Sequence, residues 1–205
     1  MITVVPAPPK QRPPIAPVGA PTFTFAQVPQ RVRAVSPVVP ILASWASVSA
    51  GQSTRDQFIE TACNALHVSR IVVQHIAHVT VAAVAPAQPV AGRVIDDYRD
   101  RDAASLRTVT ETPEVAQARI ERFVTSTLEQ YGRDELIDIS ADFGSSGWIW
   151  RTDSDPCDYC AEREGQHYDL GDEFRDHPNC GCYPEPVFDL GYSDHAHDKA
   201  GASHE

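Results

Sequence analysis

The residues best suited to chemistry in this sequence are four cysteines near its C-terminal end. Cys157 and Cys160 form a Cys-x-x-Cys pair, and Cys180 and Cys182 form a Cys-x-Cys pair. One turn can aim both sulfurs of such a pair at a single point. Two pairs that meet complete a tetrahedral zinc site, with Zn–S distances of about 2.3 Å. We therefore predict a structural Zn²⁺ site in the last third of the chain.

The four coordination positions have five candidate ligands, because His177 lies close to the second cysteine pair. Four thiolates leave the site with a charge of about −2, whereas exchanging one of them for a neutral histidine leaves about −1. Gly181 favours the cysteines, since glycine permits the backbone angles that two sulfurs in one turn require. We predict Cys157, Cys160, Cys180 and Cys182 as ligands, with His177 as the alternative ligand. The competing interpretations are two disulfides, which synthesis in a cytoplasm would disfavour, and four reduced cysteines without a metal.

The same stretch carries a longer motif. It consists of Gly147-Trp148, Arg151, Cys157-x-x-Cys160, Gly165, His177-Pro-Asn-Cys180-Gly-Cys182 and Pro184-Glu-Pro-Val-Phe188. This motif resembles the C-terminal motif of the MuF-like minor head proteins of tailed bacteriophages, over roughly residues 133–190. Many family members have an arginine where this chain has Gly181, and glycine is typical of the actinobacterial-phage branch. The difference removes a positive charge without altering a predicted ligand.

The resemblance implies a function that the spacing of the residues does not reveal. It implies a minor capsid protein of the virion, made in the host bacterial cytoplasm and associated with the portal and major capsid proteins at the head interior. The implied role is in head assembly and in DNA packaging or ejection, without enzymatic activity. An oligomer in the head is a further expectation.

Charge divides the chain into two unlike parts. Residues 132–205 carry a net charge of −13, whereas residues 1–131 carry +2. An acidic module is repelled by the DNA backbone, so any contact with packaged double-stranded DNA is expected through the N-terminal part. Residues 1–40 contain ten of the seventeen prolines and no acidic residue. We predict that they form a basic arm, extended or disordered.

The intervening residues predict a helical region at 41–132. Ser53 or Thr54 can start a long helix that ends near residue 85, and Thr112-Pro113 can start another that Gly132 closes. The charged residues at 93–107 predict a solvated face or a charged connector. A short amphipathic segment at 134–143 and a strand at 147–152 follow. Residues 133–190 form the predicted C-terminal module, and residues 191–205 a disordered acidic, histidine-containing tail.

These elements predict a mainly α fold with a small C-terminal α+β module resembling a zinc knuckle and an extended proline-rich N-terminal arm. The apolar stretch at 71–92 contains histidines, Gln74 and two prolines, which makes it unsuitable as a membrane span. Met1 leads directly into Pro6 without the regions of a signal peptide, so we expect no membrane association.

Two other functions fit the same cysteines. One is a zinc-binding protein-interaction module of prophage origin. The other is a cysteine hydrolase with His167 or His177 as base, or a zinc hydrolase with Glu162 or Glu164 near an open coordination position. Cysteines two or three positions apart are more typical of ligands than of a lone nucleophile, and the sequence lacks Gly-x-Ser-x-Gly, His-Glu-x-x-His and phosphate-loop motifs.

Overall fold

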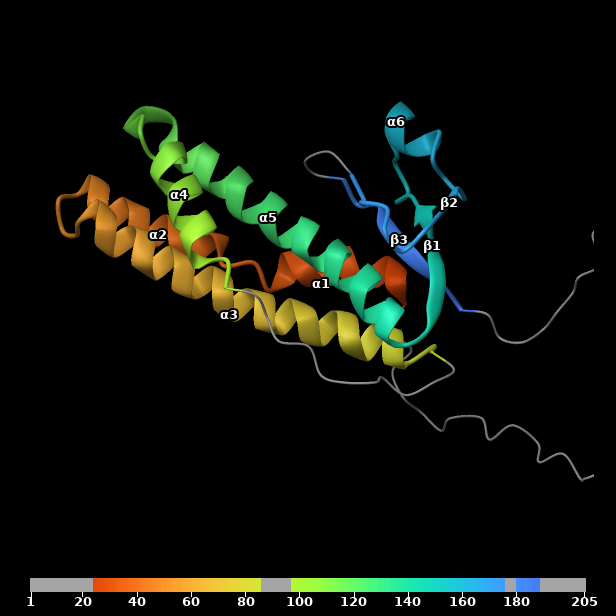
Figure 1. Ribbon diagram of the computed structural model, residues 1–205. Coiled ribbons are helices and arrows are strands. Elements are labelled where there is room, and N and C mark those ends of the chain that lie inside the picture. Colours follow the sequence, from red (N-terminus) through yellow and green to blue (C-terminus); the bar gives the residue numbers. More distant parts are fainter. Residues whose placement is uncertain (1–23, 86–96, 176–179, 189–205) are drawn as a thin grey trace, which may run out of the picture.

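The computed structural model describes residues 24–85, 97–175 and 180–188, and it is mostly helical with a small antiparallel sheet near the C-terminal end (Figure 1). The predicted mainly α fold with a C-terminal α+β part is therefore confirmed. Residues 1–23, most of the predicted arm, and the predicted tail at 191–205 lie outside the described residues. In chain order the elements are a 3₁₀ turn (Phe25–Gln27), α1 (Val28–Ala34), α2 (Val38–Ser49), α3 (Arg55–Ala82), α4 (Arg99–Val109), α5 (Pro113–Asp142), β1 (Ser145–Arg151), α6 (Asp158–Ala161), β2 (His167–Tyr168) and β3 (Tyr183–Phe188).

The two longest helices, α3 and α5, pack side by side and form the centre of the helical part (Figure 1). A capping box starts α3, in which Thr54 Oγ1 accepts the Gln57 N–H at 3.2 Å and Gln57 Oε1 accepts the Thr54 N–H at 2.8 Å. Pro113 opens α5 directly after Thr112, as predicted. The core between the helices includes the fully buried side chains of Phe58, Leu66, Val73, Leu106, Ile120, Val124 and Leu136.

Gly132 does not end a helix, contrary to the prediction. α5 continues to Asp142, so it also absorbs the segment predicted at 134–143 and crosses the predicted module boundary at 132. A Cβ at Gly132 would lie 3.0 Å from a Val32 methyl and 3.3 Å from a Val73 methyl. Glycine is required here for the close approach of α1 and α3 to α5, rather than for a turn.

The prediction of an extended arm is wrong for residues 25–40. The 3₁₀ turn, α1 and the first residues of α2 occupy this range. Pro29 is the second residue of α1 and Pro40 the third of α2, where a helix needs no backbone N–H donor. Two of the basic residues attributed to the arm also have partners within the fold: Arg33 pairs with Glu129, and Arg55 donates to Thr110 Oγ1 at 2.9 Å.

The helical stretch Phe25–Ser49 is also long and apolar enough to cross a membrane by length and composition alone, with a mean hydropathy of 1.3 in its most apolar part. It is divided into the 3₁₀ turn, α1 and α2. Val32 and Ile41 from it lie in the helical core.

The charged segment predicted as a solvated face or a charged connector contains α4, which has one exposed face and one buried face. Asp102 and Leu106, one helical turn apart, both point into the core. The Asp102 carboxylate accepts two hydrogen bonds from the Arg70 guanidinium of α3, at 2.5 and 2.9 Å, and both side chains are buried. The Arg70 guanidinium also lies 4.5 Å from the centre of the Tyr98 ring.

We expect Asp102→Ala to lower the free energy of unfolding by about 3–5 kcal/mol, because it leaves the Arg70 charge buried without its carboxylate. Urea denaturation followed by circular dichroism measures this loss. The matched control is Glu173→Ala, which breaks the exposed pair with Arg175 and should change stability by less than about 1 kcal/mol. Equal losses of unfolding free energy in the two variants would show that the buried Arg70–Asp102 pair stabilises the fold no more than an exposed pair does.

The sheet lies against α5 in the C-terminal part of the chain (Figure 1). β1 is the central strand in the order β2-β1-β3, and both neighbours run antiparallel to it. The predicted strand at 147–152 corresponds to β1. Trp148 and Trp150 alternate with the less buried Ile149, which places both indoles against α5.

Candidate metal centre

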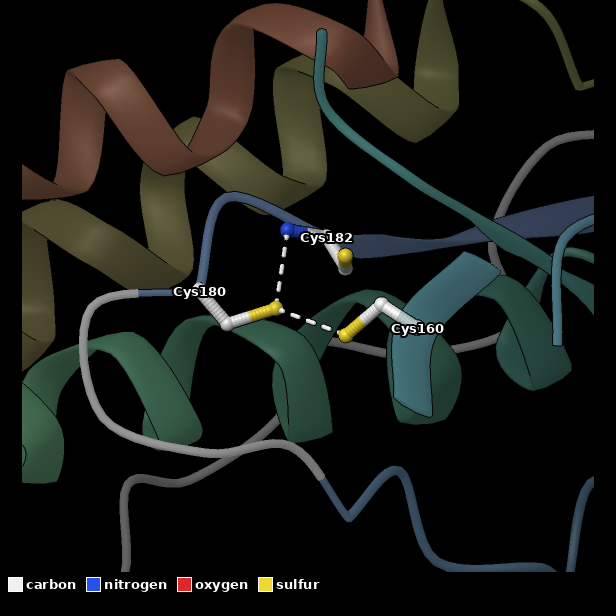
Figure 2. Close-up of side chains that lie close together, drawn as sticks. All are labelled: Cys160, Cys180 and Cys182. Atoms are coloured by element: carbon white, nitrogen blue, oxygen red, sulfur yellow. Dashed lines mark hydrogen bonds between the residues drawn. The ribbon is translucent and has the colours of Figure 1, made fainter. Parts of the chain in front are cut away.

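Three buried cysteine thiols converge between α6 and the start of β3. Cys160 lies on α6, while Cys180 and Cys182 form the turn that leads into β3 (Figure 2). Their sulfur atoms all lie within 4.8 Å of one another, and the Cys160 and Cys180 sulfurs are 3.5 Å apart. Tetrahedral zinc with Zn–S bonds of about 2.3 Å places its sulfurs about 3.8 Å apart. The three thiols could therefore hold a metal ion with small side-chain adjustments.

The structure does not place the other two predicted ligands, Cys157 and His177, with these three thiols. Cys157 is the N-cap residue of α6 and is exposed, and it is not part of the three-cysteine group among the described residues. Its carbonyl accepts the Cys160 N–H at 3.0 Å, which fixes the Cys-x-x-Cys turn. His177 lies outside the described residues. None of the five cysteines forms a disulfide. The fourth ligand therefore stays a prediction.

The Cys180–Cys182 turn is shaped by contacts with its own sulfur and with Asp153. The Cys182 N–H points at the Cys180 sulfur at 3.4 Å, and the Gly181 N–H donates to Asp153 Oδ2 at 3.1 Å. A Cβ at Gly181 would lie 2.2 Å from that oxygen and 2.9 Å from Asp153 Cβ. The arginine found in related motifs would thus require Asp153 to move. Glycine lets Asp153 connect the loop after β1 to this turn.

Two arginines from the helical part hold the same turn by its carbonyl groups. The buried Arg133 of α5 donates to the Cys182 carbonyl at 3.0 Å and to the Cys180 carbonyl at 2.7 Å. Arg33 of α1 donates to the Cys180 carbonyl at 3.2 Å and pairs with the buried Glu129 carboxylate at 2.5 Å. We call Arg33 and Arg133 the arginine clamp. The clamp fixes the cysteine turn to α1 and α5. It also places positive charge at the backbone of the turn, whose sulfurs become anionic when they bind a metal.

A small aromatic core surrounds the cysteines. Trp150 stacks on Phe174 with ring centres 4.0 Å apart, and Trp148 stacks on Tyr168 at 4.3 Å. Ile137 of α5 completes this core, and the three buried cysteines belong to the same cluster. The two tryptophans of β1 therefore cover a small core. The cluster is separate from the helical core, so metal binding would act on it directly.

Burial makes the thiols reluctant to ionise. It raises the pKa of Cys160, with a contribution from hydrogen bonding to Cys180, and it raises the pKa of Cys180 to about 11. Hydrogen bonding by the Cys157 thiol also raises the Cys160 pKa, so this thiol interacts with the cluster from its exposed position. Without a metal the Cys160 and Cys180 thiols are protonated at neutral pH, and metal binding must displace those protons.

The described residues considered as base or carboxylate for a hydrolase make other contacts and do not join the three-cysteine group. His167 is exposed on β2, paired with Ile149 of β1. The Glu164 carboxylate accepts the Thr152 N–H at 2.6 Å and pairs with Arg151 at 3.2 Å. Neither residue belongs to the group of candidate ligands found among the described residues, nor does Glu162.

Comparison of the chain with protein-family models, with curated proteins and with solved structures found no match. The resemblance to MuF-like proteins therefore rests on the motif residues alone. Sequence reasoning identified the cysteines but missed the arginine clamp. Arg133 and Arg33 carry no local signal of their role, because their partners lie far away along the chain.

We expect the metal-free and zinc-loaded forms to respond to pH in opposite ways. In the metal-free form the Cys180 pKa is raised from about 9 to about 11, so its stabilising effect is present below pH 9 and is lost as the pH rises through 11. In the loaded form acid protonates the bound thiolates, so stability is lost as the pH falls. Thermal melts followed by tryptophan fluorescence, between about pH 5.5 and pH 11 with chelator or with zinc, measure both trends. The same pH trend in both forms would contradict this account.

We expect Arg133→Met to lower the free energy of unfolding of the loaded protein by about 2–4 kcal/mol and to weaken metal binding at least about tenfold, because two charge-assisted hydrogen bonds are lost. Arg133→Lys should be intermediate, since lysine keeps the charge without the planar fork. Competition with a chromogenic chelator measures the affinity. Arg175→Met, at an exposed site, is the control and should leave affinity unchanged. Unchanged affinity in Arg133→Met would show that the clamp does not support the centre.

Proposed function

We propose that this chain is a non-enzymatic minor head protein of a tailed bacteriophage whose C-terminal module is stabilised by a structural zinc ion. The single observation that carries the metal part is the convergence of three buried thiols within 4.8 Å of one another. The motif at 147–188 carries the phage part. Its partners would be the portal and major capsid proteins, and its location the head of the virion.

The surroundings of the thiols support a structural rather than a catalytic role. A nucleophilic cysteine needs a lowered pKa and access to substrate, whereas burial raises the pKa of both Cys160 and Cys180. A structural zinc site is closed and its ligands are anchored to the fold. Here the arginine clamp, Asp153 and the aromatic core hold the ligand turn in place.

The metal would join α6 to the turn that leads into β3. β3 already pairs with β1 and packs on α5, whereas α6 is a single short helical turn. The chain between α6 and β3, which includes β2, forms a loop that carries the Cys160 and Cys180 ligands at its two ends. A metal bound to both ends restricts that loop in the unfolded chain as well as adding bonds in the folded one. Zinc fits best, because thiolates in tetrahedral arrangement favour it among the abundant divalent metals.

Contact with packaged DNA is the less specific part of the proposal. Arg33 and Arg55 have partners within the fold, and Arg31 also takes part in an interaction there. Lys10 and Arg12, the basic residues nearest the N-terminus, are therefore the candidates for phosphate contacts. The acidic C-terminal module would instead face protein partners.

Metal content tests the proposal. We expect about one zinc per chain, by native mass spectrometry of the full-length protein purified without chelator. Zinc should be lost in Cys160→Ser and Cys157→Ser and kept in His177→Ala. Cys63→Ser is the matched control, because Cys63 is also buried but lies on α3 in the helical core.

If zinc is retained in Cys157→Ser but lost in His177→Ala, the fourth ligand is His177 rather than Cys157. That result would still support the metal centre. A folded wild-type protein that contains no metal would end the zinc proposal. Incorporation into heads assembled with the portal and major capsid proteins tests the phage role separately, and we expect the Cys180→Ser, Cys182→Ser double variant to be excluded.

A further inference from the structure

The outward side of α3 is apolar, although its inward side already supplies the core. Val68 is 59% exposed, Ile71 46% and Val72 38%. They are three and four positions apart, so they share one side of the helix, opposite Leu66 and Val73 in the core. A helix on the surface of a monomer normally presents polar side chains there.

The same surface carries no formal charge. Between Thr61 and Ala85 the one charged residue other than histidine is Arg70, and the buried pair with Asp102 removes it from the surface. No charged residue occurs from Ala34 to Thr54, the stretch that contains α2. α2 packs beside α3, where Ser69 Oγ donates to the Val35 carbonyl at 3.1 Å just before α2 begins (Figure 1). Val39 in its first turn is also exposed.

We propose that the exposed apolar side of α3, together with the neighbouring α2, is the contact surface between two copies of the chain. We call this surface the α2–α3 face and define it by Val68, Ile71 and Val72. The chain has a net charge of −11, so two copies repel each other over most orientations. The α2–α3 face is where they can approach without bringing carboxylates together. A strongly charged partner would gain no attraction from it, whereas a twofold arrangement covers each apolar side chain with another.

The size of the face sets the expected strength of the contact. The uncharged part of α3 is about 33 Å long and α2 about 18 Å long, from a rise of about 1.5 Å per residue. With a helix width of about 10 Å, each copy can bury on the order of 500 Å². The total of about 1,000 Å² lies at the lower limit for a specific interface. The dimer should therefore be reversible and concentration-dependent.

Sedimentation velocity of the full-length, zinc-loaded protein from about 1 µM to about 500 µM tests the proposal. We expect a monomer–dimer equilibrium in the wild type. Val68→Glu combined with Val72→Glu should weaken it at least about 100-fold, because each copy would bury two unpaired charges. The matched control is Val115→Glu at the start of α5, since Val115 is 41% exposed against 38% for Val72 but lies away from the face. It should dimerise like the wild type, and circular dichroism verifies that all variants fold.

Two results would overturn the proposal. A wild-type protein that stays monomeric at every concentration tested would rule out a second copy as the occupant of the α2–α3 face. Cosedimentation of that monomer with neutral phosphatidylcholine vesicles would then identify a lipid surface as the occupant. A dimer that persists unchanged in the double variant would show that the copies meet elsewhere. Neither result depends on zinc occupancy, so the metal proposal is tested independently.

Discussion

The hydrogen bonds from Arg133 to the Cys180 and Cys182 carbonyls are the interaction on which the two parts of this molecule depend. Gly132, which precedes Arg133 in α5, lies against Val32 and Val73. The absence of a side chain at Gly132 lets α1 and α3 approach α5 closely. Two consecutive residues of α5 thus set the packing of the helices and the position of the cysteine turn. Because α5 has no break at this point, the sheet and the helical core share one rigid element.

Charge gives the same region a second constraint. The residues from 132 onward carry a net charge of −13, and thiolates bound to a divalent metal would add to it. Arg133 brings a positive charge to the turn from the helical part, while the charge of Arg33 is paired with the Glu129 carboxylate. An anionic metal centre inside the acidic module would therefore have Arg133, from an element outside the sheet, as a compensating charge.

Local patterns in the sequence predicted the parts of the structure that depend on neighbouring residues. The start of α5 at Pro113 and the strand at Trp148 follow from short-range rules. The spacing of the cysteines also predicted that Cys160 would meet Cys180 and Cys182, whereas Cys157 lies outside the group that the structure forms. The errors arose where a distant contact decides. Gly132 was predicted to end a helix, because its contacts with Val32 and Val73 lie too far along the chain to be recognised from the sequence. Asp102 was predicted to be solvated for the same reason, since its partner is the distant Arg70. The prolines at 29 and 40 show a further limit, since proline breaks a helix only beyond its first turn.

The aromatic core of the C-terminal part is too costly to stand without support. The indole N–H groups of Trp148 and Trp150 are buried without an acceptor among the described residues, and each such group costs about 1–3 kcal/mol. The core has few members to offset this, since Ile137 and Phe174 are its other large buried side chains. Packing against α5 and the arginine clamp supply part of the missing stability. A metal joining Cys160 to Cys180 and Cys182 would supply more by closing the loop between α6 and β3. A metal held by the buried cysteines would thus act as a crosslink within a small core.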